Sequence, residues 1–449
     1  MSQPSHSAAV PHAGETPFRF VHCADVHLDA PFRCASDDVR ARLHDAGRAA
    51  FLRVADLCLA EHVHALLIAG DLFDDERLTF ATEEFLLEQV GRLAAAGIHV
   101  VIACGNHDSG GRDGRAARLA WPTSRVTLVT GHEPQIIAIT ACDGALVGRA
   151  IAAGHADERD GSNLAALFPA GNGAVPTVGL LHARVAEAAG MERHPAVAPC
   201  TLADLAATGY DYWALGHVHG RQELRASDAP AGSGPLACYA GTLIGHHAGE
   251  TGARGALLVT VPAPVAGQPR GAVTAEFRPL AGVRWETLDV PDLAAIADLS
   301  ALRASVTEAF LRLAGPDAAD GGQRWMLRVE LSGPCPAAAE LQRDELLEEL
   351  SEQLCAELLP AGVLALQLVE CGVHRPVALG SHRGQPHVLG LSLQVIDELA
   401  SDEALLARLA PGALAGCDGG DEAAKRAYLR SLLHGIDSAA GESLLKESA

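Results

Sequence analysis

The sequence predicts an α/β fold, and three observations carry that prediction. Short apolar segments typical of buried strands occur at 18–23, 64–69 and 98–103. Between them lie two longer segments, 38–62 and 79–96, whose apolar residues recur at helical spacing. Such an alternation, with helices long enough to cross over between strands, predicts a mainly parallel sheet covered by helices.

A second group of strand candidates follows this first run. They are short apolar segments separated by glycine and proline, at 126–129, 135–141, 145–150, 175–181, 211–216, 237–241, 255–261 and 275–280. We expect these strands to form a second set that packs with the first.

The pattern changes at Val283, where one compact β-α-β-α-β module is predicted. Its elements are a strand at 283–290, a helix at 292–313, a strand at 324–332, a helix at 337–358 and a strand at 363–373. Proline, glycine, serine and histidine at 376–390 indicate a linker. The remainder, 391–449, has apolar residues at helical spacing, with a glycine-rich break at 411–420 and a last helix at 421–433.

The composition excludes several classes of protein. Apolar residues make up 49% and charged residues 20% of the 449 residues, which excludes a mostly disordered chain. No stretch approaches about 18 consecutive apolar residues, so no membrane span is expected. The net charge of −22 argues against broad adhesion to nucleic acid but leaves a local metal-filled groove open.

Two further features concern the location of the protein. The eleven cysteines include no CxxC pair, and several lie in apolar segments, which favours reduced thiols and a cytoplasmic protein. Residues 1–16 have neither a basic segment nor an apolar segment of the kind found in signal peptides. We expect them to form a short disordered tail.

Five short motifs carry the candidate chemistry, and each lies at the end of a predicted strand. They are Asp25-x-His27, Gly70-Asp71, Gly105-Asn106-His107-Asp108, His182 in GLLHAR, and Gly216-His217-Val218-His219. In an α/β sheet, ligands collect at the carboxyl ends of the strands. Residues far apart in the sequence are therefore expected to meet at one place.

The residue types in these motifs agree in their chemistry. Carboxylate, amide and imidazole groups without a thiolate suit Mn, Fe or Zn and disfavour a structural cysteine-type zinc site. A bridging carboxylate can hold two ions about 3.5–4 Å apart, and such a pair activates water and clamps a phosphoryl oxygen. Each motif alone has a plain alternative, such as a turn or a hydrogen-bonded core histidine. All five in this order favour a metal centre.

In this order the motifs resemble those of the calcineurin-like metallophosphoesterase superfamily. The segments ADVHLDAPF (24–32), AGDLFD (69–74) and GNHD (105–108) are similar to those of the SbcD-like DNA repair exonuclease family. Other segments resemble the YhaO branch of that family, namely LLHARV (180–185), APCTLADL (198–205), GYDYWALGHVHGRQ (209–222) and AGTLIGHHAGETGARGALLV (240–259). The resemblance covers about residues 17–280 and is weaker through 283–373.

The resemblance implies a role for each candidate residue, with two divalent ions, Mn²⁺ before Fe or Zn, as cofactors. One ion would be held by Asp25, His27 and His219, the other by Asn106, His182 and His217, with Asp71 bridging the two. His107 would stabilise the scissile phosphate and protonate the leaving oxygen, because an imidazole titrates near neutral pH. Asp108 would orient His107.

We therefore expect a two-sheet α/β/β/α metallophosphoesterase (nuclease) domain at 17–282 and a small α/β cap domain at 283–375. A linker at 376–390 and a helical tail at 391–449, a candidate segment for partner docking, would follow. The resemblance implies that the cap shapes access of DNA to the site.

The implied function is that of a metal-dependent DNA exonuclease or endonuclease that hydrolyses phosphodiester bonds in DNA repair. Relatives of this type act with an SMC-like, SbcC-type ABC ATPase, and a homodimer is compatible with the resemblance. One alternative is a metallophosphodiesterase acting on a small nucleotide-type substrate. Another is a non-catalytic subunit that positions an ATPase. Turnover on a generic phosphodiester compared with duplex DNA would separate the first two functions.

Several basic residues outside the motifs are weaker candidates. Arg33, Arg112 and Arg115 could contact phosphates near the site, although surface arginines are usually only solvated. His246 and His247 follow a predicted strand, where a contact with substrate or a role at the strand end is conceivable.

Overall fold

A computed structural model describes most of the chain in two compact units, Met1–Trp285 and Glu286–Ala449. The described residues are 16–32, 36–73, 78–109, 114–122, 124–156, 161–190, 195–226, 234–265, 271–290, 292–315, 322–376, 379–402, 404–405 and the single positions 433, 436, 437, 440, 441 and 444. The sequence had suggested the domain boundary between Gly282 and Val283. Apart from Thr16, the tail predicted at 1–16 lies outside the described residues. So does the helix predicted at 421–433, apart from Leu433.

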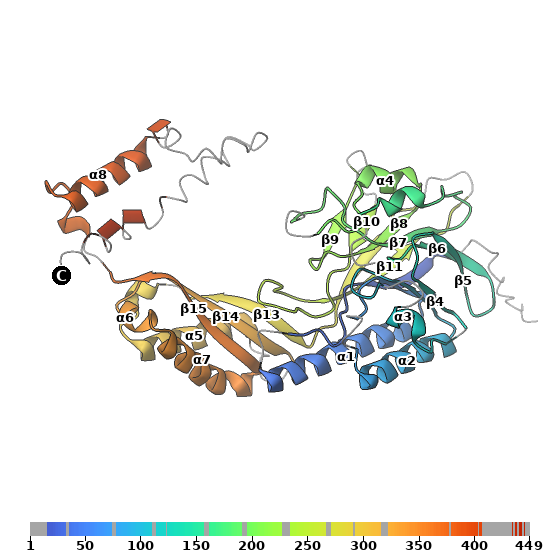
Figure 1. The fold of residues 1–449 in the computed structure, drawn as a ribbon, viewed down its shortest axis with the longest axis horizontal. Coiled ribbons are helices and arrows are strands. Elements are labelled where there is room, and N and C mark those ends of the chain that lie inside the picture. The colour runs from blue at the N-terminus through green and yellow to red at the C-terminus, as the bar shows by residue number, and fades with distance from the viewer. Residues whose placement is uncertain are drawn as a thin grey trace, which may run out of the picture. The chain divides into compact units, whose positions relative to one another are not determined.

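The first sheet of the first unit has six strands in the order β12-β11-β1-β2-β3-β4. The strands are β1 (Phe18–Cys23), β2 (Ala65–Ala69), β3 (His99–Ala103), β4 (Val126–Val129), β11 (Gly255–Val261) and β12 (Thr274–Pro279). β1 to β4 are parallel, and β11 pairs antiparallel with β1. The crossover helices α1 (Asp37–Ala60) and α2 (Phe80–Ala95) lie side by side (Figure 1), as the first run of the sequence predicted.

The second sheet also has six strands, in the order β5-β6-β7-β8-β10-β9. They are β5 (Gln135–Thr140), β6 (Leu146–Ala152), β7 (Thr177–His182), β8 (Tyr212–Gly216), β9 (Gln222–Leu224) and β10 (Ala237–Tyr239). The central strands β6, β7, β8 and β10 are parallel, and the edge strands β5 and β9 are antiparallel to their neighbours.

The two sheets pack face to face around one apolar core. Phe18, Phe20 and Leu67 of the first sheet share this core with Val178 and Tyr212 of the second. Alternate side chains point to the other face of each sheet. On the second sheet that face packs with the short helices η1 (Leu164–Leu167) and α4 (Leu202–Ala207). The layers are therefore helix, sheet, sheet and helix, which confirms the predicted α/β/β/α arrangement.

Capping residues explain where several helices of the first unit begin. The hydroxyl of Ser36 accepts from the amide of Val39 at the start of α1, and Thr79 caps α2 in the same way. At α4, Thr201 and Asp204 form a reciprocal capping box. The four-residue helix α3 (Arg115–Arg118) has no side-chain cap.

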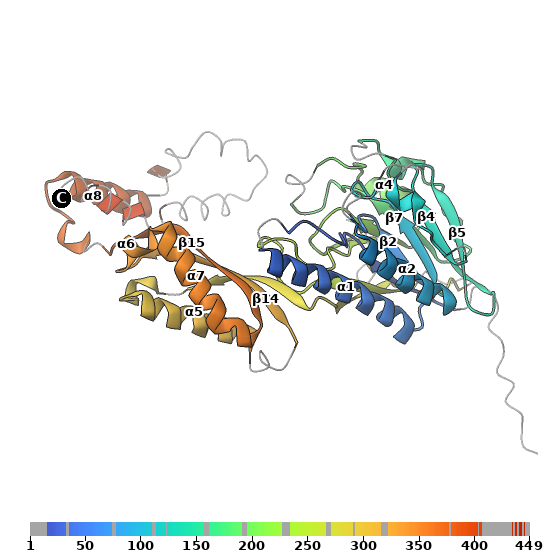
Figure 2. The same ribbon diagram turned by 60° about the horizontal axis from the view of Figure 1, so that its bottom comes forward.

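The second unit is built on a three-stranded sheet, β13-β14-β15, whose first strand begins at the end of the first unit. Its elements are β13 (Val283–Asp289), η3 (Leu293–Ala295), α5 (Leu299–Ala314), β14 (Arg324–Pro334), α6 (Ala338–Leu341), α7 (Asp344–Leu358), η4 (Leu359–Ala361) and β15 (Val363–His374). β14 and β15 are parallel, and α5 and α7 lie side by side in Figure 2. Buried apolar residues of the helices and strands form one core. The small α/β module that the sequence predicted is therefore present.

Two predicted helices of this unit are divided. The predicted helix 292–313 begins as the turn η3, and α5 starts only after Asp298, whose carboxylate accepts from the amide of Ala301 at 2.9 Å. The predicted helix 337–358 is interrupted between α6 and α7. The first break depends on the local cap at Asp298, which apolar periodicity does not detect, whereas α7 begins without a side-chain cap.

Helix α8 (Val388–Ser401) begins inside the predicted linker 376–390. Its start is set by His387, whose ring Nδ1 accepts from the amide of Gly390 at 3.1 Å. A short turn, η5 (Leu379–Ser381), precedes it. Among the described residues, no helix combines the length and the apolar character that a membrane crossing requires.

Candidate metal centre

The candidate residues converge at the carboxyl ends of strands from both sheets. The amide of Asp25, after β1, donates to the carbonyl of Gly70, after β2, at 3.1 Å. The amide of His217, after β8, donates to the Asp25 carboxylate at 2.9 Å. The ring Nδ1 of His182, at the end of β7, donates to the carbonyl of Ala69 at 2.9 Å. These bonds join the ends of four strands, as the position of the motifs predicted.

Asp25, His27 and His219 form the first set of candidate ligands. Each offers one ligand atom, and the three atoms lie within 4.8 Å of one another. Asp25 is fully buried and His27 is 7% exposed. The rings of His27 and His219 are 5.3 Å apart. One cation could therefore contact all three side chains.

Asn106, His182 and His217 form the second set. The ring Nε2 of His182 lies 3.1 Å from the amide oxygen of Asn106 and 3.2 Å from Oδ2 of Asp71. The rings of His182 and His217 are 5.3 Å apart. His182 is completely buried and His217 is 6% exposed. Nε2 of His182 therefore meets oxygens of Asn106 and Asp71 at one point. The ring of His217 lies beside them, with its Nε2 directed to the carbonyl of Pro195 at 3.1 Å.

Asp71 lies between the two sets. Its Oδ2 is 3.6 Å from Nε2 of His27 in the first set and 3.2 Å from Nε2 of His182 in the second. Its Oδ1 accepts from the backbone amide of His107 at 2.9 Å. Gly105 makes room for this carboxylate, because a Cβ atom there would lie 2.2 Å from Oδ1. One carboxylate oxygen is thus placed to face both sets.

The backbone at the site is strained. Asp25, His27, Asp71 and His217 have φ angles of 49°, 45°, 51° and 99°, in a region that side chains other than glycine rarely occupy. Backbone hydrogen bonds hold this geometry, among them that from the amide of His27 to the carbonyl of Asp71 at 3.0 Å. Strained backbone that the surroundings hold in this way is typical of functional sites.

The protonation of the buried groups indicates an excess of negative charge. Burial, with a smaller contribution from the Asp71 charge, raises the pKa of Asp25. Burial also raises the pKa of Asp71, but the attraction of His182, His27 and His107 outweighs it and holds that pKa well below its usual range. Burial lowers the pKa of His182, and its hydrogen bond and attraction to Asp71 more than compensate, raising it to about 9.

These donors fit divalent cations. The buried oxygens and nitrogens belong to carboxylate, amide and imidazole groups, which are ligands of borderline and hard metal ions. Two buried carboxylates close together are costly unless positive charge compensates them. A divalent ion would supply that charge, and it would displace the proton that His182 otherwise holds beside Asp71.

Asp108 ties two strand-end loops together. Its two carboxylate oxygens accept from the backbone amides of Leu72 at 2.7 Å and Gly105 at 2.6 Å. Burial, and then the nearby charge of Asp71, raise the pKa of Asp108 to about 7. The orientation of His107 by Asp108 stays a prediction. The His107 side chain is exposed, and its ring lies 4.9 Å from that of His27.

Glu250 is a residue of the site that the sequence analysis missed. Its Oε1 lies 2.5 Å from Nδ1 of His219, and its Oε2 accepts from the backbone amide of His246 at 2.8 Å. Burial raises the pKa of this carboxyl, but the hydrogen bond and charge of His219 outweigh burial and lower the pKa to about 2. The signal was present in the sequence, because Glu250 follows the two histidines already under consideration, His246 and His247.

The weaker arginine candidates have a different outcome. Arg115 forms an ion pair with Glu83 at 3.1 Å and lies 6.0 Å from the centre of the Phe80 ring. These contacts tie the start of α3 to α2. Arg33 and Arg112 lie outside the described residues.

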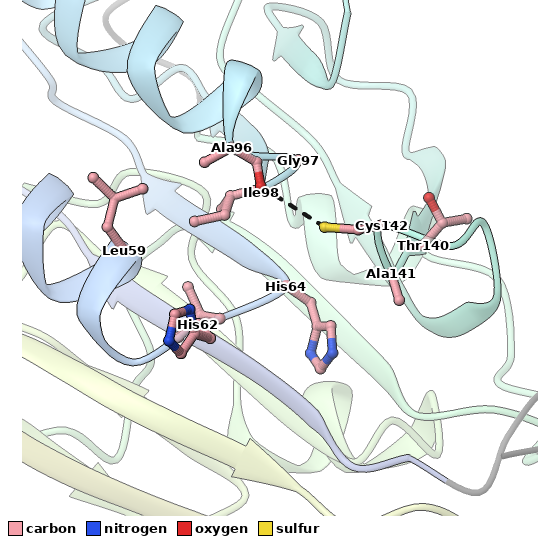
Figure 3. A pocket seen from close by; sticks show the side chains of 10 residues that line it. Leu59, His62, His64, Ala96, Gly97, Ile98, Thr140, Ala141 and Cys142 are labelled. Atoms are coloured by element: carbon pink, nitrogen blue, oxygen red, sulfur yellow. Dashed lines mark hydrogen bonds between the residues drawn. The ribbon is translucent and has the colours of Figure 1, made fainter. Parts of the chain in front are cut away.

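A separate hollow lies at the opposite, amino ends of β2 and β3. It has a volume of about 210 Å³, and the residues around it include His62, His64 and Cys142 (Figure 3). The thiol of Cys142 approaches the carbonyl of Ala96 at 3.8 Å, and Nδ1 of His64 accepts from the amide of Arg19. Within the described part of the chain, none of the candidate ligands lines this hollow. The candidate site is therefore at the other edge of the sheet.

Comparison with known proteins agrees with this geometry. The family model described as calcineurin-like phosphoesterase matches residues 18–221, and that described as metallophosphoesterase YhaO, middle domain, matches 285–364. The chain belongs to the calcineurin-like phosphoesterase family, as its motifs predicted, and is a metallophosphoesterase, a hydrolase of phosphoesters. Members of this family bind divalent metals. Among the described residues, Asp25, His27 and His219 form one group that could hold such an ion, and Asp25, Asp71 and His182 form another.

Two relatives are informative. The chain is 31% identical over 349 residues to the uncharacterized metallophosphoesterase YhaO of Bacillus subtilis, covering 76% of this chain and 79% of the relative. It is 38% identical over 92 residues to the DNA double-strand break repair protein Mre11 of Aeropyrum pernix. That second match covers only 20% of this chain and 21% of the relative.

Proposed function

We propose that this metallophosphoesterase is a dinuclear DNA nuclease that cuts phosphodiester bonds during DNA repair. The observation that carries the dinuclear part is the position of Asp71, whose Oδ2 lies 3.6 Å from His27 and 3.2 Å from His182. A carboxylate oxygen that faces two separate groups of ligands suits a bridge between two ions. The similarity of a short segment to a DNA double-strand break repair protein supports DNA as the substrate.

In this proposal the first set and the second set would each hold one ion, Mn²⁺ before Fe or Zn, and Asp71 would be shared between them. Two such ions, when bound, supply the positive charge that activates water and clamps phosphoryl oxygens. Two divalent ions against the carboxylates Asp25 and Asp71 make the site net positive. The site can therefore attract phosphate although the whole chain carries a charge of −22.

His107 supplies the acid catalysis. Its backbone is tied to Oδ1 of Asp71 at 2.9 Å, while its side chain is exposed at the edge of the site. The ring can therefore reach a phosphodiester that lies over the ligands. It would stabilise the scissile phosphate and donate a proton to the leaving oxygen.

The remaining predictions concern the setting of the reaction. Weak, salt-sensitive DNA affinity is expected for so acidic a chain, which favours an SMC-like, SbcC-type ABC ATPase as a partner that supplies DNA binding. The tail at 391–449 is the proposed docking segment. A cytoplasmic location is favoured because none of the cysteines among the described residues is joined in a disulfide. A homodimer also stays a prediction.

The test is the degradation of end-labelled linear DNA by the purified chain with and without Mn²⁺, beside His107→Ala and Asp71→Ala. Hydrolysis of a generic phosphodiester is assayed in parallel. Cleavage of DNA that requires manganese and both residues would support the proposal. Hydrolysis of the ester without any cleavage of DNA, even after addition of the ATPase, would favour a small nucleotide-type substrate. No hydrolysis of either substrate would favour a non-catalytic subunit.

A further inference from the structure

The connection between β10 and β11 contacts the backbone of His219. The carbonyl of His219 accepts from the amide of Thr242 at 3.1 Å and also from the guanidinium of Arg254. Arg254 donates in addition to the hydroxyl of Thr242 at 3.2 Å. Gly241 allows this close approach, because its φ is +75° and a Cβ atom there would lie 2.8 Å from the carbonyl oxygen of His219. The connection therefore holds His219 firmly on its backbone side.

The same connection holds the imidazole through Glu250. Glu250 is only 5% exposed, and its Oε1 lies 2.5 Å from Nδ1 of His219. An ionised carboxylate can only accept, so Nδ1 carries the hydrogen. The lone pair is then on Nε2, the nitrogen left for a cation that contacts Asp25 and His27.

The contact between Glu250 and His219 suits a hydrogen bond better than joint binding of one further ion. His219, His246 and Glu250 do form a close trio of potential ligand atoms. However, two donors bound to one ion at about 2.0–2.2 Å lie about 3 Å or more apart in tetrahedral or octahedral geometry. The 2.5 Å between Oε1 and Nδ1 is shorter than that separation and suits a hydrogen bond.

The histidines of the second set are held differently. Nδ1 of His182 donates to the carbonyl of Ala69 at 2.9 Å, and Nε2 of His217 donates to the carbonyl of Pro195 at 3.1 Å. A carbonyl selects the tautomer of the ring but carries no net charge. A carboxylate does both, because its negative charge also makes the imidazole a stronger donor to a cation.

We infer that Glu250 is a positioning residue that orients His219 and strengthens the binding of the ion held by the first set, but not of the ion held by the second. The inference rests on the ligand roles proposed above. It adds to the metal centre a residue from outside the five motifs. It also implies that the two ion sites differ in affinity, because a carboxylate supports a histidine of the first set while carbonyls support the histidines of the second.

The experiment is a calorimetric titration of metal-free protein with Mn²⁺, for the wild type, Glu250→Gln and Glu250→Ala. Glu223→Gln is the matched control, because Glu223 is exposed and pairs with Arg225 at 3.1 Å away from the candidate ligands. The loss of such a supporting contact typically lowers metal affinity by about 10–100-fold. We expect Glu250→Ala to lose that much at one site only. Glu250→Gln, whose amide oxygen still accepts from Nδ1, should lose less.

A double-mutant cycle assigns the affected site and separates the possible failures. In a His219→Ala background, Glu250→Ala should have no further effect on Mn²⁺ affinity, whereas in a His182→Ala background its effect should persist. Two sites of unchanged affinity in both Glu250 variants would overturn the inference and leave the dinuclear proposal intact. Equal losses at both sites would also overturn it, since they indicate general loosening. A wild-type protein that binds no ion would overturn both.

Discussion

The two sets of candidate ligands are built from different kinds of structure. In the second set, His182 is the last residue of β7 and is completely buried, and its ring is held by the carbonyl of Ala69 on the neighbouring sheet. In the first set, the side chain of His219 is 31% exposed, and a loop holds it through Glu250. The position of His182 therefore depends on how the two sheets pack, whereas the position of His219 depends on one connection between strands.

Each half of the site is therefore sensitive to a different structural change. A change in the packing of the sheets should disturb the second set, while a change in the loop after β10 should disturb the first. Asp71 contacts a histidine of each set and is the point at which the two halves meet.

The largest effect is expected from Asp71→Ala, which removes the group shared by both sets. Both Mn²⁺ ions should be lost, and hydrolysis of a generic phosphodiester should fall to background. Titration calorimetry and the rate of hydrolysis measure the two losses. Asp143→Ala is the control, because Asp143 is an exposed turn residue. Retention of two tightly bound ions by Asp71→Ala would show that the two sets are independent.

His107→Ala should affect catalysis while leaving both sets occupied, because His107 belongs to neither. Loss of a general acid lowers kcat by about 10²–10⁴-fold. The expected result is such a decrease on a generic phosphodiester with an unchanged Mn²⁺ titration. If the variant instead loses an ion, His107 is a ligand, and the division into two sets of three needs correction.

Chemical rescue should separate the exposed histidine from the buried one. Added imidazole can enter the space left by His219→Ala, since that side chain is 31% exposed, but it cannot reach the space left by His182, which is fully buried. We expect imidazole to restore Mn²⁺ binding only in His219→Ala. His182→Ala should also lose about 1–3 kcal/mol of stability, because the carbonyl of Ala69 is left without its donor. Rescue of both variants would mean that the buried half opens in solution.

The last effect is confined to low pH and concerns the stability of the contact between the two sheets. His22 of β1 contacts the hydroxyl of Tyr212 and the carbonyl of Leu215 on β8, the strand that leads to His217. Burial lowers the pKa of His22 from 6.5 to about 3. Between these values the unfolded chain binds a proton that the folded chain does not, so stability falls as the pH decreases from about 6.5 to about 3.

The slope from this one group is at most about 1.4 kcal/mol per pH unit. In metal-free protein, His22→Gln should therefore have a shallower loss of stability in this range, as measured by urea unfolding at several pH values. Parallel slopes for the variant and the wild type would show that His22 takes up its proton in the folded state. The contact between the two sheets would then not depend on a neutral His22 imidazole.

Much of the fold, and the convergence of the candidate residues at the strand ends, could be predicted because the signals are local. The strands that end at Cys23, Ala69, Ala103 and Gly216 are short apolar segments, and each is followed at once by a polar motif. Helix boundaries were less predictable. The late start of α5 and the early start of α8 depend on single capping side chains, Asp298 and His387.

Local sequence patterns were enough to predict the class of the protein, the two-sheet layering and the residue types that meet at the strand ends, because strand periodicity and the order of motifs are properties of neighbouring residues. The packing of the sheets and loops decided that Asp71 faces both sets, that Asp108 bonds the amide of Leu72, and that Glu250 contacts His219. These contacts join residues 30 or more positions apart. They arise when two sheets and their loops pack together, and no local pattern encodes the direction of a side chain after that packing.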